Sequence, residues 1–246
     1  MNQKLALPEV TLVGLTSVKI YETVRAMQYS MRGIRFGDAV LLTDRKPLYL
    51  PRGIRWEPVD RMCTVDDYSR ACLYELHRHI RTGHALIVHY DGYVVNPDQW
   101  DDAFLQYDYI GAPWPEKPHF MDPHTGEYRR VGNGVSLRSL RLMRWTAEHG
   151  AELPPDETGK LMNEDVFLCV QARKEMEREG FRWAPFSMAL RFGREKTLAE
   201  NQDIEPFLFH KWTAQNQYPE FMGPATLMEK LRRHLGSRQN GRRQSG

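Results

Sequence analysis

Asp91 is the first residue of the chain whose position suggests chemistry. It directly follows Ala85–Tyr90, the strongest buried-strand pattern in the sequence, and precedes Gly92. A carboxylate at such a place is costly unless it is solvated, paired or bound to a metal, and hard divalent cations prefer carboxylate oxygens. The residues leave two interpretations open, a metal ligand and an ordinary Asp-Gly turn.

A second candidate is Asn133, which lies between two glycines inside the apolar segment Val131–Leu137. Glycines in a strand allow close approach of the backbone to a ligand. The segment contains neither a G-x-G-x-x-G nor a G-x-x-x-x-G-K pattern, which argues against a dinucleotide fingerprint and a phosphate-binding loop. A plain hairpin or bulge is the alternative.

Glu164 and Asp165 follow Asn163 at the expected start of a helix. Asn is a good N-cap, and acidic residues in a first turn complement the helix dipole, so a purely structural role is one interpretation. The other is a general base presented next to the Pro/Asp/Gly-containing segment 150–162, which is a candidate lid.

His210 stands inside the aromatic segment Phe207–Trp212, either as a packed core histidine or as a metal ligand. Three further polar residues follow the first two expected strands: Thr16, Ser17 and Asp44.

Strand-like and helix-like segments alternate in the first 110 residues. Because the strands are continuously apolar, they predict a parallel sheet covered by helices. Ligands of such a sheet bind at the carboxyl ends of its strands, which is where Asp91, Thr16, Ser17 and Asp44 fall. The expected strands are Val10–Leu15, Asp38–Thr43, Gly53–Pro58 and Ala85–Tyr90, with helices over Ile20–Met31 and from Thr64 to Ile80.

Local signals define some boundaries. Thr64 and Asp67 have the spacing of a capping box, with Asp in place of the usual Glu. Ile34–Phe36 is expected to be a short turn. In the second half, strands are expected at Tyr109–Ala112 and Val131–Leu137, helices at Leu137–His149 and Glu164–Glu179, and no clear periodicity at 187–211.

Composition limits the class of protein. The chain has 246 residues, 41% hydrophobic and 27% charged, which excludes bulk disorder, collagen and a coiled coil. No apolar run approaches the length of a membrane span, and the N-terminus does not resemble a signal peptide, so we expect a cytoplasmic location. Three scattered cysteines predict neither a disulfide framework nor a zinc site.

Charge is unevenly distributed. The net charge is only +2, which makes nucleic acid an unlikely partner. Residues 225–246 carry six Lys or Arg against one Glu, and one interpretation of this end is peripheral contact with the inner face of an anionic membrane. We expect one domain over residues 8–222, followed at 223–246 by a basic helix (Thr226–Leu235) and a disordered tail.

Together these segments resemble a GT-A glycosyltransferase, and more closely the bacterial family classed as domain of unknown function 5672, which is regarded as GT-A-like. The resemblance covers roughly residues 8–212. It rests on Y-S-R at Tyr68–Arg70, V-H-Y-D-G-Y, the run Trp100–Pro115, G-N-G-V-S-L-R-S and N-E-D-V-F.

The resemblance implies an α/β fold with a mainly parallel central sheet flanked by helices. It also implies a divalent cation, Mn²⁺ or Mg²⁺, that holds the diphosphate of a nucleotide-sugar donor. H-Y-D stands where such enzymes have D-x-D, so Asp91 would contact the metal and His89 replaces the first Asp. A late histidine ligand would correspond to His210.

The remaining site residues follow from the same resemblance. The last acid of the x-E-D motif corresponds to Asp165, the base of an inverting transfer to a hydroxyl of a glycan or lipid-linked acceptor, with Glu164 in support. The base and ribose of the donor would meet Thr16, Ser17 and Asp44. Further donor-binding residues would be Tyr68, Arg70, His89, Asn133 and Gly134.

Two other classes of protein remain open. A sugar nucleotidyltransferase would need a glycine-rich, basic loop after the first strand, and the segment Gly14–Lys19 is poor in glycine. A catalytically inactive module that binds sugar, nucleic acid or an anionic surface is compatible with His89 in place of Asp.

Overall fold

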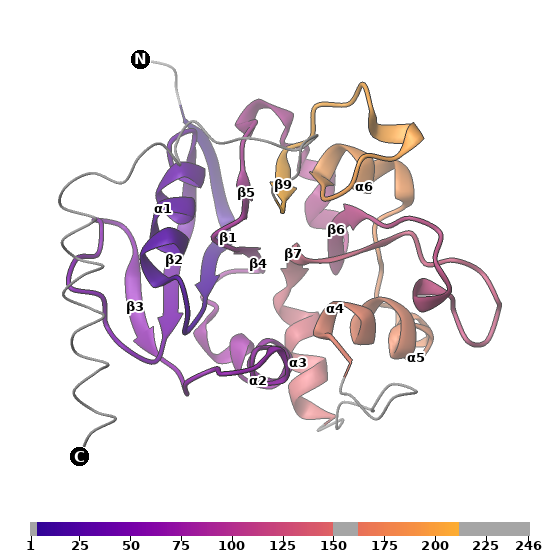
Figure 1. Ribbon diagram of the computed structural model, residues 1–246, viewed down its shortest axis with the longest axis horizontal. Coiled ribbons are helices and arrows are strands. Elements are labelled where there is room, and N and C mark those ends of the chain that lie inside the picture. The colour runs from indigo at the N-terminus through magenta and orange to yellow at the C-terminus, as the bar shows by residue number, and fades with distance from the viewer. Residues whose placement is uncertain (1–3, 150–161, 212–246) are drawn as a thin grey trace. The chain divides into compact units, whose positions relative to one another are not determined.

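A six-stranded mixed sheet forms the centre of the computed structural model, which describes residues 4–149 and 162–211 (Figure 1). The strand order is β3-β2-β1-β4-β7-β6. β1, β2, β3 and β4 are parallel, and β7 runs antiparallel to both of its neighbours, β4 and β6. The predicted mainly parallel α/β sheet is therefore confirmed. The strands are β1 (Leu5–Leu15), β2 (Ile34–Thr43), β3 (Arg55–Pro58), β4 (His84–Val88), β6 (Tyr109–Pro113) and β7 (Val131–Ser139).

Helices cover both faces of this sheet. α1 (Ile20–Ser30) packs on one face, where a Cβ on Gly14 would lie 2.7 Å from the sulfur of Met27. On the other face, side chains of β1, β2 and β4 form a buried cluster with Cys72, Leu76 and Met143. These three come from the α2 segment and from α3 (Leu140–Glu148). Leu12, Leu41, Ile87 and Val88 are fully buried in the sheet, as predicted.

The α2 segment changes helical geometry along its length. It begins as α2 (Val65–Arg70), continues as the π-helical turn Ala71–Glu75 and ends as the 3-10 turn Leu76–His79. The predicted capping box is present: Thr64 Oγ1 accepts the N–H of Asp67 at 3.1 Å, and Asp67 accepts the N–H of Thr64 at 2.9 Å.

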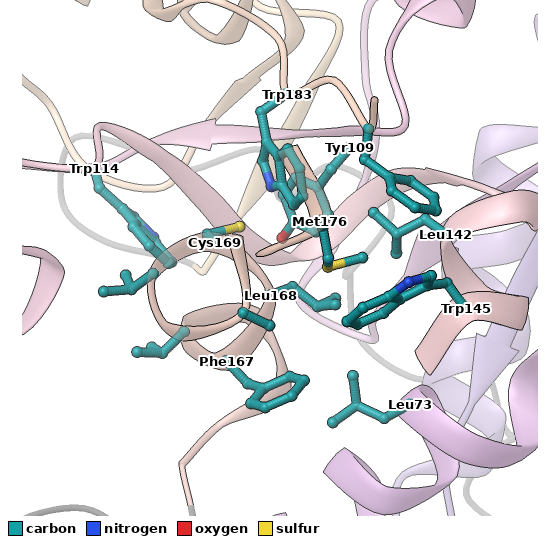
Figure 2. Close-up of a cluster of buried hydrophobic side chains, with 14 residues drawn as sticks. Leu73, Tyr109, Trp114, Leu142, Trp145, Phe167, Leu168, Cys169, Met176 and Trp183 are labelled. Atoms are coloured by element: carbon teal, nitrogen blue, oxygen red, sulfur yellow. The ribbon is translucent and has the colours of Figure 1, made fainter. Parts of the chain in front are cut away.

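A second buried cluster lies between α3 and the acidic helix that follows it (Figure 2). Here Trp145 packs with Phe167, Leu168 and Met176. Tyr109 and Trp183 belong to the same cluster and lie near the top of the view. The acidic helix consists of α4 (Glu164–Val166), the π-helical turn Phe167–Gln171 and α5 (Arg173–Arg178), and α6 (Phe186–Phe192) follows.

A small second sheet has the order β5-β9-β8 and was not predicted. Its strands are only two or three residues long: β5 (Gly92–Val94), β8 (Gly193–Arg194) and β9 (Leu208–His210). Segments this short carry no readable alternation, so their pairing depends on tertiary contacts. Short 3-10 turns lie at Pro97–Gln99, Asp102–Gln106, Pro118–Phe120 and Ala199–Asn201.

Several predicted boundaries were wrong. β1 begins at Leu5, five residues before the predicted start at Val10. Ile34–Phe36 is the first part of β2, because it pairs with Leu5–Leu7 of β1. Leu137 belongs to β7, since it pairs with β4 and β6, and α3 begins only after the N-cap Ser139. β4 ends at Val88, two residues early.

No helix among residues 4–149 and 162–211 is long and apolar enough to cross a membrane. The predicted lid, the domain boundary at residue 222 and the basic helix at 226–235 fall wholly or almost wholly outside the described residues.

Loss of the cap at Thr64 should weaken the fold measurably. Thr64→Ala removes the hydroxyl that accepts the N–H of Asp67, so the free energy of unfolding in urea should fall by about 1 kcal/mol. Thr197→Ala removes an exposed hydroxyl for which the described residues show no hydrogen bond, and it should leave stability unchanged. Equal stability of the two variants would show that the cap contributes nothing.

Candidate active site

A tight turn at the end of β4 carries Asp91. The N–H of His89 donates to the carbonyl of Gly92 at 2.8 Å, and the N–H of Gly92 donates back to His89 at 3.2 Å. Tyr90 and Asp91 occupy the tip of this turn, with Asp91 half-buried at the carboxyl edge of the parallel strands. Asp91 therefore lies at the carboxyl ends of the parallel strands, as expected.

β5 pairs with β9, and this pairing places His210 opposite Gly92 of the turn. The two residues are 118 positions apart in the chain. The N–H of Lys211 donates to the carbonyl of Asp91 at 2.8 Å. Gly92 must remain glycine, because a Cβ there would lie 2.7 Å from the ring of His210 and 2.6 Å from Val135. The predicted approach of His210 to Asp91 is thus present.

Three side chains form one cluster at this point: His89, Asp91 and His210. One ligand atom of each lies within 4.8 Å of the others. His210 Nε2 is 3.8 Å from Asp91 Oδ1 and 3.2 Å from His89 Nδ1. His89, expected only to bind the donor, therefore belongs to the candidate metal cluster.

The protonation states of the cluster suit a cation. Burial lowers the pKa of His89 to about 4 and lowers the pKa of His210 well below its ordinary value, so both rings are neutral near pH 7. A metal requires neutral imidazoles. The residues therefore fit a divalent ion, and two nitrogen donors with one oxygen donor suit Mn²⁺, Fe²⁺ or Zn²⁺ better than Mg²⁺, which prefers oxygen.

Tyr68 sets the orientation of the His89 ring. Its hydroxyl lies 2.7 Å from His89 Nε2, which leaves Nδ1 facing His210. Partners of this kind on the far nitrogen usually fix the ring of a ligating histidine. Tyr68, predicted to bind the donor, is thus placed behind the cluster.

The acid pair lies on the other side of the site, at the start of α4. Glu164 is buried, with Oε1 2.8 Å from Nη2 of Arg138, and both side chains are almost inaccessible to solvent. The N–H of Glu164 donates to Ser69 Oγ at 3.3 Å, which links α4 to α2. Arg138 also donates from Nε to Ser136 at 2.9 Å.

Gly134 is the point where the cluster and the acid pair meet. A Cβ on Gly134 would lie 3.2 Å from Cε1 of His89 and 3.4 Å from Oε1 of Glu164. Because Gly134 has no side chain, the imidazole of His89 and the carboxylate of Glu164 both lie close to it. The first belongs to the H-Y-D motif and the second to the N-E-D motif.

Asp165 has the electrostatic environment of a base. It is half-buried, and burial together with the negative charge of Glu164 raises its pKa to about 7, while Arg138 opposes the shift. The N–H of Val166 donates to Asp165 Oδ1 at 2.9 Å. Burial and the neighbouring carboxylate thus outweigh the helix start, which favours the ionised form.

Two of the predicted base-and-ribose residues lie together at the sheet edge. The N–H of Thr16 donates to the carbonyl of Leu42 at 3.0 Å, which places it beside the end of β2, where Asp44 accepts the hydroxyl of Thr43 at 3.3 Å. Ser17 accepts the N–H of Met62 at 2.9 Å, so its hydroxyl holds the segment after β3.

Asn133 and Arg70 are not placed at the cluster. Asn133 is 2% exposed and has φ of 98°, and its amide nitrogen donates to Glu195 at 2.7 Å. Arg70 lines a separate cavity of about 600 Å³ between α2 and residues 58–62, which none of the cluster residues lines. Contacts of both residues with a donor stay predictions.

Sequence reasoning missed three residues. Arg138 could have been found, because a charge inside an apolar central strand requires a partner. Ser69 stands in the quoted Y-S-R motif, yet its link to Glu164 spans 95 positions. Glu195 lies in a segment without periodicity and gave no signal.

The sequence matches the family described as "Protein of unknown function (DUF5672)" over residues 60–210, more than half of the chain. The chain belongs to this family, as the resemblance indicated. No curated protein matches it.

Several solved structures are similar in fold. The galactosyltransferase LgtC in complex with donor and acceptor sugar analogues is 12% identical, with a TM-score of 0.46 over 83% of this chain and 87% of that one. An active-site mutant of LgtC is 13% identical, with a TM-score of 0.47 over 93% and 95%. The apo form of the glycosyltransferase GlyE from Streptococcus pneumoniae TIGR4 is 11% identical, with a TM-score of 0.45 over 94% of this chain and 60% of that one.

The environment of Asp165 predicts a pH-dependent stability. Its pKa is raised from 3.8 to about 7, so the folded protein keeps a proton that the unfolded chain loses between about pH 4 and 7. The stability that this group contributes is therefore present below pH 4 and lost as the pH rises through 7. Asp165→Asn removes the dependence and should gain roughly 2–4 kcal/mol relative to the wild type between pH 4 and 8.

Urea unfolding at several pH values measures this difference. Asp203→Asn, a substitution on the exposed surface, is the matched control and should track the wild type. An Asp165→Asn curve parallel to the wild type at every pH would contradict the raised pKa.

Proposed function

We propose that this protein is a glycosyltransferase that moves a sugar from a nucleotide-sugar donor to a hydroxyl of a glycan or lipid-linked acceptor, with inversion and with a divalent cation. The observation that carries the proposal is the meeting of two groups at Gly134. One is the His89, Asp91 and His210 cluster, of which His89 lies next to Gly134. The other is the acid pair, of which Glu164 lies next to Gly134 and Asp165 has the raised pKa.

The two groups supply the two needs of the reaction. As the acceptor hydroxyl attacks the anomeric carbon, it must lose a proton, and we assign Asp165 as the base that accepts it, which its raised pKa supports. The bond between the sugar and the diphosphate breaks at the same time. His89, Asp91 and His210 would hold a divalent cation there, which would supply positive charge for the leaving diphosphate. Mn²⁺ is the proposed ion, because the resemblance implies Mn²⁺ or Mg²⁺ and the two imidazole donors disfavour Mg²⁺, which prefers oxygen ligands.

The resemblance to GT-A-like sequences supports this chemistry, and the donor would lie along the carboxyl edge of the parallel strands. Thr16 and Asp44 at the ends of β1 and β2 are proposed to meet its base and ribose. A cytoplasmic location and membrane contact through residues 223–246 remain part of the proposal. A nucleotidyltransferase or an inactive binding module is an outcome that the experiments below would reveal.

The metal role is tested by Asp91→Asn. It removes the only carboxylate of the cluster, so the gain in donor binding that Mn²⁺ produces should disappear, while binding without metal stays as in the wild type. Calorimetry with a panel of nucleotide sugars, each with and without Mn²⁺, measures both. Asp101→Asn, which alters a carboxylate at the start of a 3-10 turn, is the control. A Mn²⁺ effect that survives Asp91→Asn would refute the cluster as the metal site.

The base is tested by Asp165→Asn. Donor affinity should stay nearly intact while transfer falls by about 10²–10⁴-fold, the usual range for a general base. Glu164→Gln should reduce transfer less, although it weakens the buried pair with Arg138, so rates are compared per folded protein. Product formation is followed with the donor identified by calorimetry. If Asp165→Asn transfers sugar at the normal rate and Glu164→Gln is inactive, Glu164 is the base and Asp165 supports it. If both variants are active, neither residue is the base, and the pair serves only as the acidic first turn of a helix.

A further inference from the structure

Three residues with unusual backbone conformations are linked, directly or through one further side chain, to the turn that carries Asp91. Among residues 4–149 and 162–211, only three that are not glycine have positive φ: Lys19 at 48°, Asn133 at 98° and Lys211 at 63°. Residues other than glycine rarely adopt a positive φ, and residues with strained backbones cluster at functional sites. All three connect to the turn that carries Asp91, as the following contacts show.

Lys19 approaches the turn from the loop between β1 and α1. Its amine lies 4.5 Å from the centre of the Tyr90 ring, next to Asp91 in the chain. Its charge is close enough to lower the pKa of the Asp91 carboxyl, against the larger effect of burial. Lys19 is exposed, so a ligand at the turn can reach its amine.

Lys211 approaches from the end of β9, directly after His210. Its side chain is 57% exposed, and its amine donates to Glu195 Oε1 at 2.6 Å. Glu195 is held in turn by the amide of Asn133 at 2.7 Å. Asn133, the third residue with positive φ, thus holds the carboxylate of Glu195, which in turn positions the amine of Lys211.

We infer that Lys19 and Lys211 bind the two phosphates of the donor beside Asp91, and this inference rests on the proposed function. The two lysines come from separate elements and meet at one turn: the amine of Lys19 lies over the ring of Tyr90, and the N–H of Lys211 donates to the carbonyl of Asp91. This arrangement fits an anion with two linked charged groups.

The charges of the site agree with a diphosphate. A nucleotide-sugar diphosphate carries two negative charges, and Asp91 with a divalent cation offers one net positive charge. Lys19 supplies the second, while Lys211 and Glu195 form a neutral pair. The leaving nucleoside diphosphate gains a further negative charge, and the amine of Lys211 would donate a hydrogen bond to it while remaining paired with Glu195. Asn133, which the sequence predicted to contact the donor sugar, would then act on the donor only through Glu195 and Lys211.

The test is calorimetric binding of inorganic pyrophosphate and of inorganic phosphate in the presence of Mn²⁺. The wild type should bind pyrophosphate more tightly than phosphate. Lys19→Gln and Lys211→Gln should each weaken pyrophosphate binding roughly tenfold or more, as expected for one charged hydrogen bond. Lys19→Arg and Lys211→Arg should keep most of the affinity.

Lys117→Gln is the matched control, because Lys117 is exposed and no contact joins it to the cluster among the described residues. Unchanged pyrophosphate affinity in both Gln variants would overturn the inference and leave the proposed function standing. Weakened binding in a protein that transfers no sugar would sink the proposed function and keep the lysines as diphosphate ligands. A wild type that does not bind pyrophosphate would overturn the inference, and the proposed function would still be decided by the nucleotide-sugar binding and transfer measurements.

Discussion

The buried ion pair between Arg138 and Glu164 is the constraint on which the rest of the site depends. A guanidinium in a central strand is tolerated only if a carboxylate reaches it, so β7 and the start of α4 must stay in register. Removing one partner of such a pair typically costs about 3–5 kcal/mol, which is a large part of a total stability of about 5–15 kcal/mol. The pair also keeps a negative charge beside Asp165, and that charge helps to hold the Asp165 pKa near 7.

Burial determines the chemistry on both sides of Gly134. The same low exposure that keeps His89 and His210 neutral, and so able to bind a cation, raises the pKa of Asp165 toward that of a useful base. Neither effect requires an unusual residue. Both require that strands and helices exclude water from a small region, with Tyr68 and Ser69 of α2 holding the histidine ring and the acidic helix in place.

The sequence predicted those parts of the fold that have local signals. The apolar runs gave the parallel strands, and the spacing of Thr64 and Asp67 gave the cap of α2. It could not predict β5, β8 and β9, because strands of two or three residues have no period and exist only through their pairing. For the same reason, the approach of His210 to Asp91 was available only from the family resemblance, and the link from Asn133 to Lys211 through Glu195 was not available at all.

The most direct test of the account is pulsed electron paramagnetic resonance of Mn²⁺ bound to the protein with a nucleoside diphosphate. Two coordinating imidazoles and a bound diphosphate predict hyperfine couplings to histidine nitrogen and to phosphorus on the same ion. ¹⁵N-histidine labelling should shift the nitrogen signal, and His210→Ala should reduce it. A Mn²⁺ spectrum without nitrogen coupling would show that the ion binds elsewhere and would contradict the account.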